Sequence, residues 1–274
     1  MRIRVFILLI AVAFVAAAQT PSIFDGGVLN GAAFQKGQPV TGGSLISIFG
    51  SQLASSVASA SSIPLSTSLS GVTVTFTNGS TVINSPMLYV QPDDPAHQVI
   101  SQINCQVPWN LVPEGTSATV SVVVNNNGVS SQPSQVNVGP FSPGIFSSGG
   151  RAIAVNTDGT LTWPAGVIPG LNTHGAKAGD VIIVYATGLG AVDTPVADGA
   201  ASLDALRNTK TVPVVTIAGT QAQVIFSGLS PQFVGVNQLN IIIPSITPND
   251  NAPLQFQIGG ITTPNNTTIS VVSK

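Results

Sequence analysis

The stretch QINCQVP at residues 102–108 returns 136 positions later as QLNIIIP at residues 238–244. Each copy begins with Gln, an apolar residue and Asn, and each ends on Pro. In the first copy apolar and polar side chains alternate with a period of two, which is typical of a β-strand with one buried face. Proline ends such a strand because it has no N–H to pair. The stretch therefore predicts the same buried strand twice.

A second pair of stretches shares this offset: GGSLISIFGSQLA at 42–54 and AGDVIIVYATGLG at 178–190 are also 136 residues apart. Similarity that keeps its order and spacing indicates a duplicated structural unit. We predict a signal peptide at 1–18, one repeat at 19–140 and a second at 141–274, with a short linker around 139–143 through which the units pack together. Two shorter matches keep the same order: PSIF (21–24) with PGIF (143–146), and VTFTNG (74–79) with VTIAG (215–219).

The rest of the chain reads as short strands and turns. Apolar residues make up 43% of it and charged residues only 7%, with 28 Gly and 20 Pro, so it favours strands over helices. NNNG (125–128) and NTDG (156–159) predict hairpin turns, because Asn-Gly and Asp-Gly accept positive φ. About seven strands per copy predict an all-β fold of two tandem immunoglobulin-like antiparallel β-sandwiches after an N-terminal signal peptide. SLDALRN (202–208) is the one short helix expected.

The first residues, MRIRVFILLIAVAFVAAAQT, combine two Arg, an apolar run and three Ala before Gln19. This pattern predicts a secretory signal peptide cleaved after Ala18, since the apolar run is shorter than the roughly 20 residues that span a bilayer. We expect a secreted, cell-surface or periplasmic protein with no membrane span in the mature chain.

Cys105 is the only cysteine, so no internal disulfide can form; we expect it to be a buried small hydrophobe.

Charge excludes one class of partner. Without the two Arg of the predicted signal peptide, six Lys and Arg face ten Asp and Glu, a net charge of −4. Nucleic-acid binding needs clustered positive charge, so no nucleic-acid partner is expected.

At these motifs the chain resembles a known family. GGVLNGAAF (26–34), QINCQVPW (102–109), SPGIF (142–146) and VGVNQLNIIIP (234–244), with the two longer stretches above, are similar to an uncharacterised secreted C-terminal module of soil acidobacteria. The resemblance implies a pair of immunoglobulin-like units of the IPT/TIG type. It implies no established activity, cofactor or catalytic residue.

Motifs for chemistry are weak. GLGAVD at 188–193 lacks the third Gly of a dinucleotide fingerprint and meets Pro195 where a helix should run, so it predicts a strand-to-loop turn. His97 and His174 lie in loop-like contexts without zinc-ligand spacing. Asp93 and Asp94 sit between two Pro and favour a rigid acidic turn over a calcium site. We predict no catalytic, cofactor-binding or metal residues.

Six residues are the candidate ligand contacts. Trp109 and Trp163 have no counterpart in the other copy, so the shared fold does not require them, although for each of them we favour a role in packing. The remaining four are the repeated amides, for which we favour hydrogen bonds to neighbouring backbone: Gln102, Asn104, Gln238 and Asn240.

The leading hypothesis is an exported, non-catalytic surface or extracellular structural or adhesion module, with envelope proteins or polysaccharide as partners. The alternative is a carbohydrate-binding module that uses the tryptophans and amides. A hydrolase ranks third, because it requires His97, His174 and an Asp to converge in one cleft.

Overall fold

The structure, a computed structural model, describes residues 20–264 and 266–273. The signal peptide predicted at 1–18 lies outside these residues. In the described part the regular structure is β-strand apart from one short 3-10 helix, η1 (Pro95–His97). The strands of the first half are β1 (Ser22–Asn30), β2 (Leu45–Ser51), β3 (Ala58–Ser59), β4 (Val72–Asn78), β5 (Thr81–Asn84), β6 (Met87–Gln91), β7 (Ser101–Gln106), β8 (Ala118–Asn126), β9 (Val129–Ser130) and β10 (Ser134–Val138).

The second half contains twelve more strands, several of them only two residues long. They are β11 (Gly144–Ile145), β12 (Ser147–Ser148), β13 (Arg151–Ala152), β14 (Ala154–Asn156), β15 (Ala176–Lys177), β16 (Val181–Thr187), β17 (Val214–Ile217), β18 (Thr220–Leu229), β19 (Asn237–Ile242), β20 (Asn249–Ile258), β21 (Ile261–Thr262) and β22 (Thr267–Val272).

The first half is a two-layer sandwich. One sheet has the order β1-β2-β7-β6-β3 and the other the order β10-β8-β4-β5, with neighbours antiparallel. Alternate residues of each sheet face the interior, as the period of two predicts: Phe76 on β4 and Ile103 on β7 are fully buried in one apolar cluster. The chain forms this half because its longer strands, among them β2, β4, β7 and β8, each supply one apolar face to the core.

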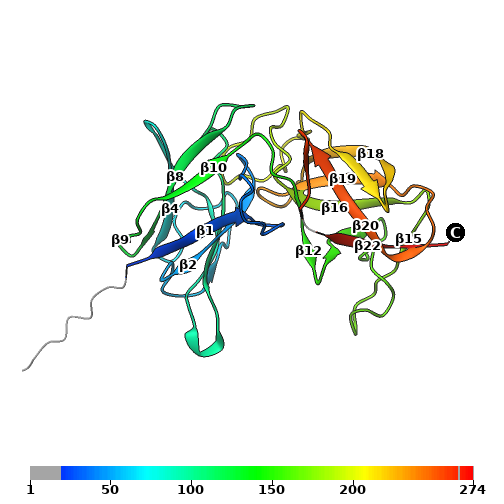
Figure 1. Ribbon diagram of the computed structural model, residues 1–274, viewed down its shortest axis with the longest axis horizontal. Helices are drawn as coiled ribbons and strands as arrows, with labels where there is room; N and C mark the ends of the chain where they lie inside the picture. Colours follow the sequence, from blue (N-terminus) through cyan, green and yellow to red (C-terminus); the bar gives the residue numbers. More distant parts are fainter. Residues whose placement is uncertain (1–19, 265, 274) are drawn as a thin grey trace, which may run out of the picture.

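The second half repeats this plan, but its strands form one continuous sheet, in which β22 pairs in parallel with β13 and β15. The long strand β18 belongs to both layers: its first residues pair with β17, and its last residues pair with β19. In the first half the equivalent stretch is divided into β5 and β6. The second core, which includes Ile182, Leu239 and Phe256, shares no residue with the first. The prediction of an all-β fold of immunoglobulin-like antiparallel sandwiches is therefore confirmed, and Figure 1 shows the two halves side by side.

Strand register repeats at the offset found in the sequence. Phe49 faces Gln102 between β2 and β7, and Tyr185 faces Gln238 between β16 and β19. Each residue of the second pair lies 136 positions after its counterpart. Both halves also have a bulge at the same place beside this central strand. Met87 and Tyr89 flank it opposite Cys105 and Asn104, and Val224 and Phe226 flank it opposite Ile241 and Asn240.

The expected helix at 202–208 is wrong. This segment is an irregular loop in which the guanidinium of Arg207 donates to both carboxylate oxygens of Asp204, at 2.7 and 3.0 Å, and to the carbonyl of Pro195 at 3.1 Å. Arg207 is buried, and its bond to the carbonyl of Pro195, 12 residues away, fixes this segment as part of an irregular loop. These tertiary contacts override the weak local helix propensity.

Both predicted hairpin turns are present. Asn127 and Gly128 have positive φ (51° and 88°) between β8 and β9, and Gly159 has φ 86° in the turn after β14. The predicted turn at 188–193 is also confirmed: it follows β16, and Gly188 approaches the linker so closely that a Cβ there would lie 2.0 Å from the carbonyl oxygen of Ser142.

Candidate functional site

The two halves meet through buried hydrogen bonds. Asn30, at the end of β1, donates through Nδ2 to the carbonyl of Ser142 in the linker at 2.6 Å. The hydroxyl of Thr187, at the end of β16, accepts from the backbone N–H of Leu45 at 3.0 Å and donates to the carbonyl of Gly235 at 2.7 Å. A buried polar group that loses its partner costs about 1–3 kcal/mol, so these bonds resist opening of the junction.

A third connection runs through Gln106, the last residue of β7. Its Oε1 accepts from the backbone N–H of Gly199 at 2.7 Å, and its Nε2 donates to the carbonyl of Gly43 at 3.1 Å. Next to it, the backbone N–H of Trp109 donates to Oδ1 of Asp198 at 2.8 Å. The irregular loop that contains Asp198 and Gly199 is thereby fixed to the end of the first sandwich.

Trp109 lines a hollow of about 700 Å³ on one side of this junction. Its half-buried ring packs on Gly43, whose backbone has φ 79°; a Cβ at this position would lie 2.2 Å from Cζ2 of Trp109. The hollow also contains the amides Asn78 and Asn110. Its rim includes an ion pair between the halves, in which Nζ of Lys210 lies 2.8 Å from Oε2 of Glu114.

Two buried polar atoms belong to residues that line this hollow and have no hydrogen-bond partner among the described residues. They are Oγ1 of Thr41 and Nε1 of Trp109. The hydroxyl can donate or accept, whereas the indole N–H only donates. Unpaired groups of this kind suit a small hydroxylated partner, including water.

Trp163 is placed differently. Its side chain is 4% exposed and its Nε1 donates to the carbonyl of Ala152 at 2.7 Å. The ring thus closes the second sandwich and offers no open face, and the structure does not bring the two tryptophans to one site.

The repeated amides lie half-buried on the outward faces of β7 and β19. In each half the glutamine donates to the asparagine two residues later: Gln102 to Asn104 at 2.7 Å, and Gln238 to Asn240 at 2.9 Å. Asn104 also accepts from the hydroxyl of Ser47 at 2.8 Å. We expected these amides to bond to neighbouring backbone; the bonds join side chains instead, because alternate residues of one strand share a face.

The histidines lie in separate halves, each beside an aspartate of its own half. Nδ1 of His97 is 2.6 Å from Asp94, and Nε2 of His174 is 2.9 Å from Asp158. The carbonyl of Gly175 and the carboxylate of Asp158 raise the pKa of His174, while hydrogen bonds from His174 and Thr160 lower the pKa of Asp158. These pairs are exposed and do not converge with each other.

The acidic turn at 93–94 caps its own loop. Asp93 accepts from the backbone N–H groups of Gln52 and Ser101 at 2.6 and 3.0 Å, and Asp94 accepts from those of Ala96 and His97 at 3.1 and 3.3 Å. This matches the predicted rigid turn.

Over residues 20–264 and 266–273 no three His, Cys, Asp or Glu side chains group as metal ligands would.

Cys105 is buried in the first core between β2 and β6, as predicted. Burial raises the pKa of its thiol to about 12, against a smaller opposite effect of a hydrogen bond with Ser85. The thiolate is therefore scarce at neutral pH.

In the part of the chain that the structure describes, no helix has the length and apolar character needed to cross a bilayer.

No family model matches this chain, and no curated protein matches it in sequence. Among solved structures, it is similar to the Bacteroides ovatus mixed-linkage glucan utilization protein SGBP-B, solved with a mixed-linkage heptasaccharide. That likeness has 12% identity and a TM-score of 0.35, and covers 94% of this chain and 48% of the other, so the chain spans about half of that protein's length.

Two further solved structures are similar to this chain. For the I9-I11 tandem of titin the identity is 10% and the TM-score 0.22, over 85% of this chain and 62% of the other. For the C-terminal domain of the Streptococcus agalactiae AgI/II polypeptide BspA the identity is 12% and the TM-score 0.20, over 89% and 98%.

Proposed function

We propose that this protein is an exported, non-catalytic module in which two immunoglobulin-like repeats form one stiff structural or adhesion unit of the cell surface or extracellular space. The observation that carries the proposal is the junction: Asn30, Gln106 and Thr187 each bond across it from buried positions. A flexible pair of domains would not need such bonds, whereas a unit that presents two surfaces at a fixed angle does. The repeats are immunoglobulin-like sandwiches, and we propose that they are of the IPT/TIG type that the resemblance implies.

The charged side chains near loops also support a structural role. His97 with Asp94, His174 with Asp158, and Arg207 with Asp204 are local pairs, and Lys210 with Glu114 joins the halves. Each pair stabilises the loop or junction where it lies, which is the use we expect in a module that presents surfaces.

Fractionation of whole cells tests export. The mature chain should be recovered from the surface or the medium with Gln19 as its first residue. Protease added to intact cells should remove any fraction that is held at the surface. A cytoplasmic chain with residues 1–18 intact contradicts the proposal.

Adhesion is tested with beads that carry the purified protein. Wild-type beads should attach to cells or matrix, and the variant Gln106→Leu, with its junction weakened, should attach less than the control Gln135→Leu on the exposed face of β10.

A second candidate function, carbohydrate binding, rests on one observation: Trp109 and the amides Asn78 and Asn110 line the same hollow. A ring face with nearby amides can hold a sugar by stacking and hydrogen bonds. A polysaccharide pull-down tests this with the wild type, Trp109→Ala, and Trp163→Phe as the control outside the hollow. Retention lost only in Trp109→Ala supports a glycan site; no retention by the wild type on any polysaccharide counts against it.

A further inference from the structure

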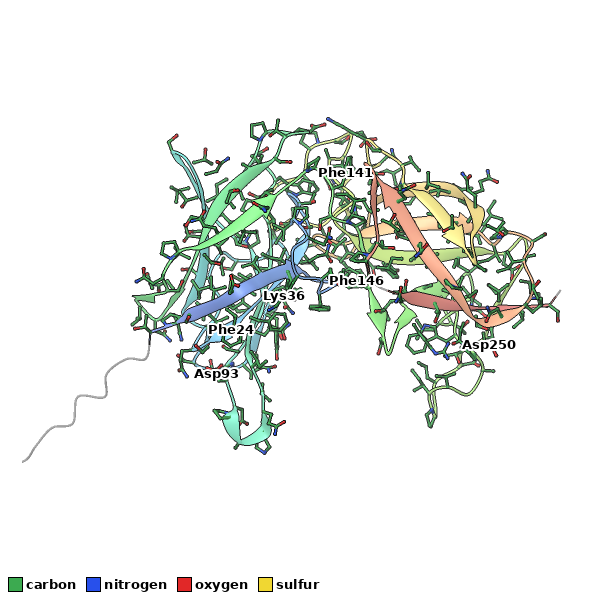
Figure 2. The ribbon with its side chains drawn as sticks, viewed as in Figure 1. Phe24, Lys36, Asp93, Phe141, Phe146 and Asp250 are labelled. Atoms are coloured by element: carbon green, nitrogen blue, oxygen red, sulfur yellow. The ribbon has the colours of Figure 1, made fainter. Side chains whose placement is uncertain are left out.

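We propose that a second hollow, also at the junction of the two halves, is a binding site for a neutral, apolar small molecule. This groove of about 850 Å³ is lined by both halves: Leu45, Leu65 and Leu88 come from the first, and Phe146, Tyr185 and Phe233 from the second. Figure 2 labels Phe146 at the junction, with Phe141 of the Trp109 hollow above it. The site goes beyond the proposed function, which does not depend on it.

The chemistry of the lining selects the ligand class. None of the groove residues carries a charged side chain, and its polar side-chain groups are the hydroxyls of Ser61, Ser62 and Tyr185 and the amide of Gln232. A charged ligand would lose its hydration here without gaining an opposite charge, which is unfavourable. A neutral apolar ligand loses little and covers apolar surface that now meets water, since Ile63 and Phe233 are 48% and 52% exposed.

The size of the groove indicates a small molecule and not a second protein chain. Pockets for small ligands usually measure about 300–1,000 Å³ and often lie where domains meet. One side of a stable protein interface uses about 20–30 residues. The groove has 14 lining residues, below that range.

The walls of the groove are held in place before any ligand arrives. The Thr187 hydroxyl links the N–H of Leu45 on one wall to the carbonyl of Gly235, in the loop that forms the other. The ring of Phe233 meets Tyr185 edge to face, with centroids 6.0 Å apart at 87°. A preformed site binds more tightly because less ordering is needed on binding.

A neutral fluorescent probe, N-phenyl-1-naphthylamine, tests the site on the full mature chain. Phe233→Ser should weaken its binding by about tenfold, corresponding to roughly 1.4 kcal/mol. Phe34→Ser is the matched control, because Phe34 is 49% exposed and packs against Phe49, the counterpart of Tyr185, yet does not line the groove. Its affinity should equal that of the wild type.

A second variant guards against a general loss of folding. Ala60→Trp places a large side chain on the half-buried groove wall and should block the probe while urea unfolding stays near wild type. If the wild type does not bind the probe, or if all three variants bind it with equal affinity, the proposal is overturned. A concentration-dependent dimer that excludes the probe and is lost in Phe233→Ser also overturns it, in favour of a contact between two copies. None of these results bears on export or adhesion, which fractionation and bead attachment measure separately.

Discussion

Oε1 of Gln106 accepts a hydrogen bond from the backbone N–H of Gly199, at 2.7 Å and across 93 residues of chain. The same amide donates to the carbonyl of Gly43, and the side chain is 1% exposed. In the second half the equivalent position, 136 residues later, is Ile242. One copy of the repeat therefore uses this position to hold the junction, while the other does not.

Replacing Gln106 with Leu should destabilise the protein. The change keeps a similar volume but leaves two buried backbone groups unpaired, each at a cost of about 1–3 kcal/mol. Urea unfolding should show a lower free energy of unfolding. Gln135→Leu, on the exposed face of β10, should change it by less than about 0.5 kcal/mol. Equal effects of the two substitutions would show that the junction bonds contribute nothing.

A glycine is needed at position 43 for two reasons: the Trp109 ring packs directly against it, and its backbone has a positive φ. Gly43→Ala should cost about 1–3 kcal/mol because its methyl group would displace the Trp109 ring. Gly37→Ala is the control: its φ of 81° is nearly the same, but a Cβ there meets nothing within 4 Å. The difference in thermal stability between the two variants isolates the steric term. No difference would mean that the ring moves aside freely.

The pair formed by Asp158 and His174 should give the protein a pH dependence. Since the pKa of His174 is raised in the folded state, its contribution to stability is present below the unfolded pKa and is lost as the pH rises through the folded pKa. Since the pKa of Asp158 is lowered, its contribution is lost as the pH falls through the folded pKa. The pair should therefore stabilise most at mildly acidic pH.

Asp158→Asn should lower the pKa of His174, measured by NMR titration of the imidazole. The stability difference from the wild type should shrink as the pH rises above the wild-type pKa of His174. A His174 pKa that is the same in both proteins would show that the carboxylate 2.9 Å away has no effect.

Cys105 should be unreactive in the folded protein. Its thiol has a pKa raised to about 12 and lies in the core, so labelling by a disulfide reagent should be slower than that of a free thiol by about 10³-fold or more. Guanidinium should restore the ordinary rate. Fast labelling without denaturant would mean that β7 opens readily from its neighbours β2 and β6.

The sequence predicted the central strands well because their pattern is local. Alternation of apolar residues placed Ile103, Cys105 and Leu239 inside, and the constant offset predicted matching registers before any contact was known. The two hydrogen bonds that the Asn104 side chain accepts follow from strand geometry: one comes from Gln102 on its own strand and the other from Ser47 on the neighbouring one.

The junction could not be predicted in the same way. Asn30 and Thr187 bond to residues 112 and 142 positions away, and those contacts depend on how two folded units dock. One signal was present: Gln106 and Ile242 differ within the best-matched stretch, and a polar residue in only one copy indicates a local need. The helix expected at 202–208 failed for a related reason, because one partner of buried Arg207 is the carbonyl of Pro195, 12 residues away.

The last strand has a mechanical consequence. β22 lies in the half of the molecule away from β1, pairs with β20, and runs parallel to β13 and β15. A tension along the chain would slide β22 past these partners and load their hydrogen bonds together, because they run across the direction of pull. Under stretching we therefore expect this part of the second half to resist in shear, with rupture governed by its unfolding rate.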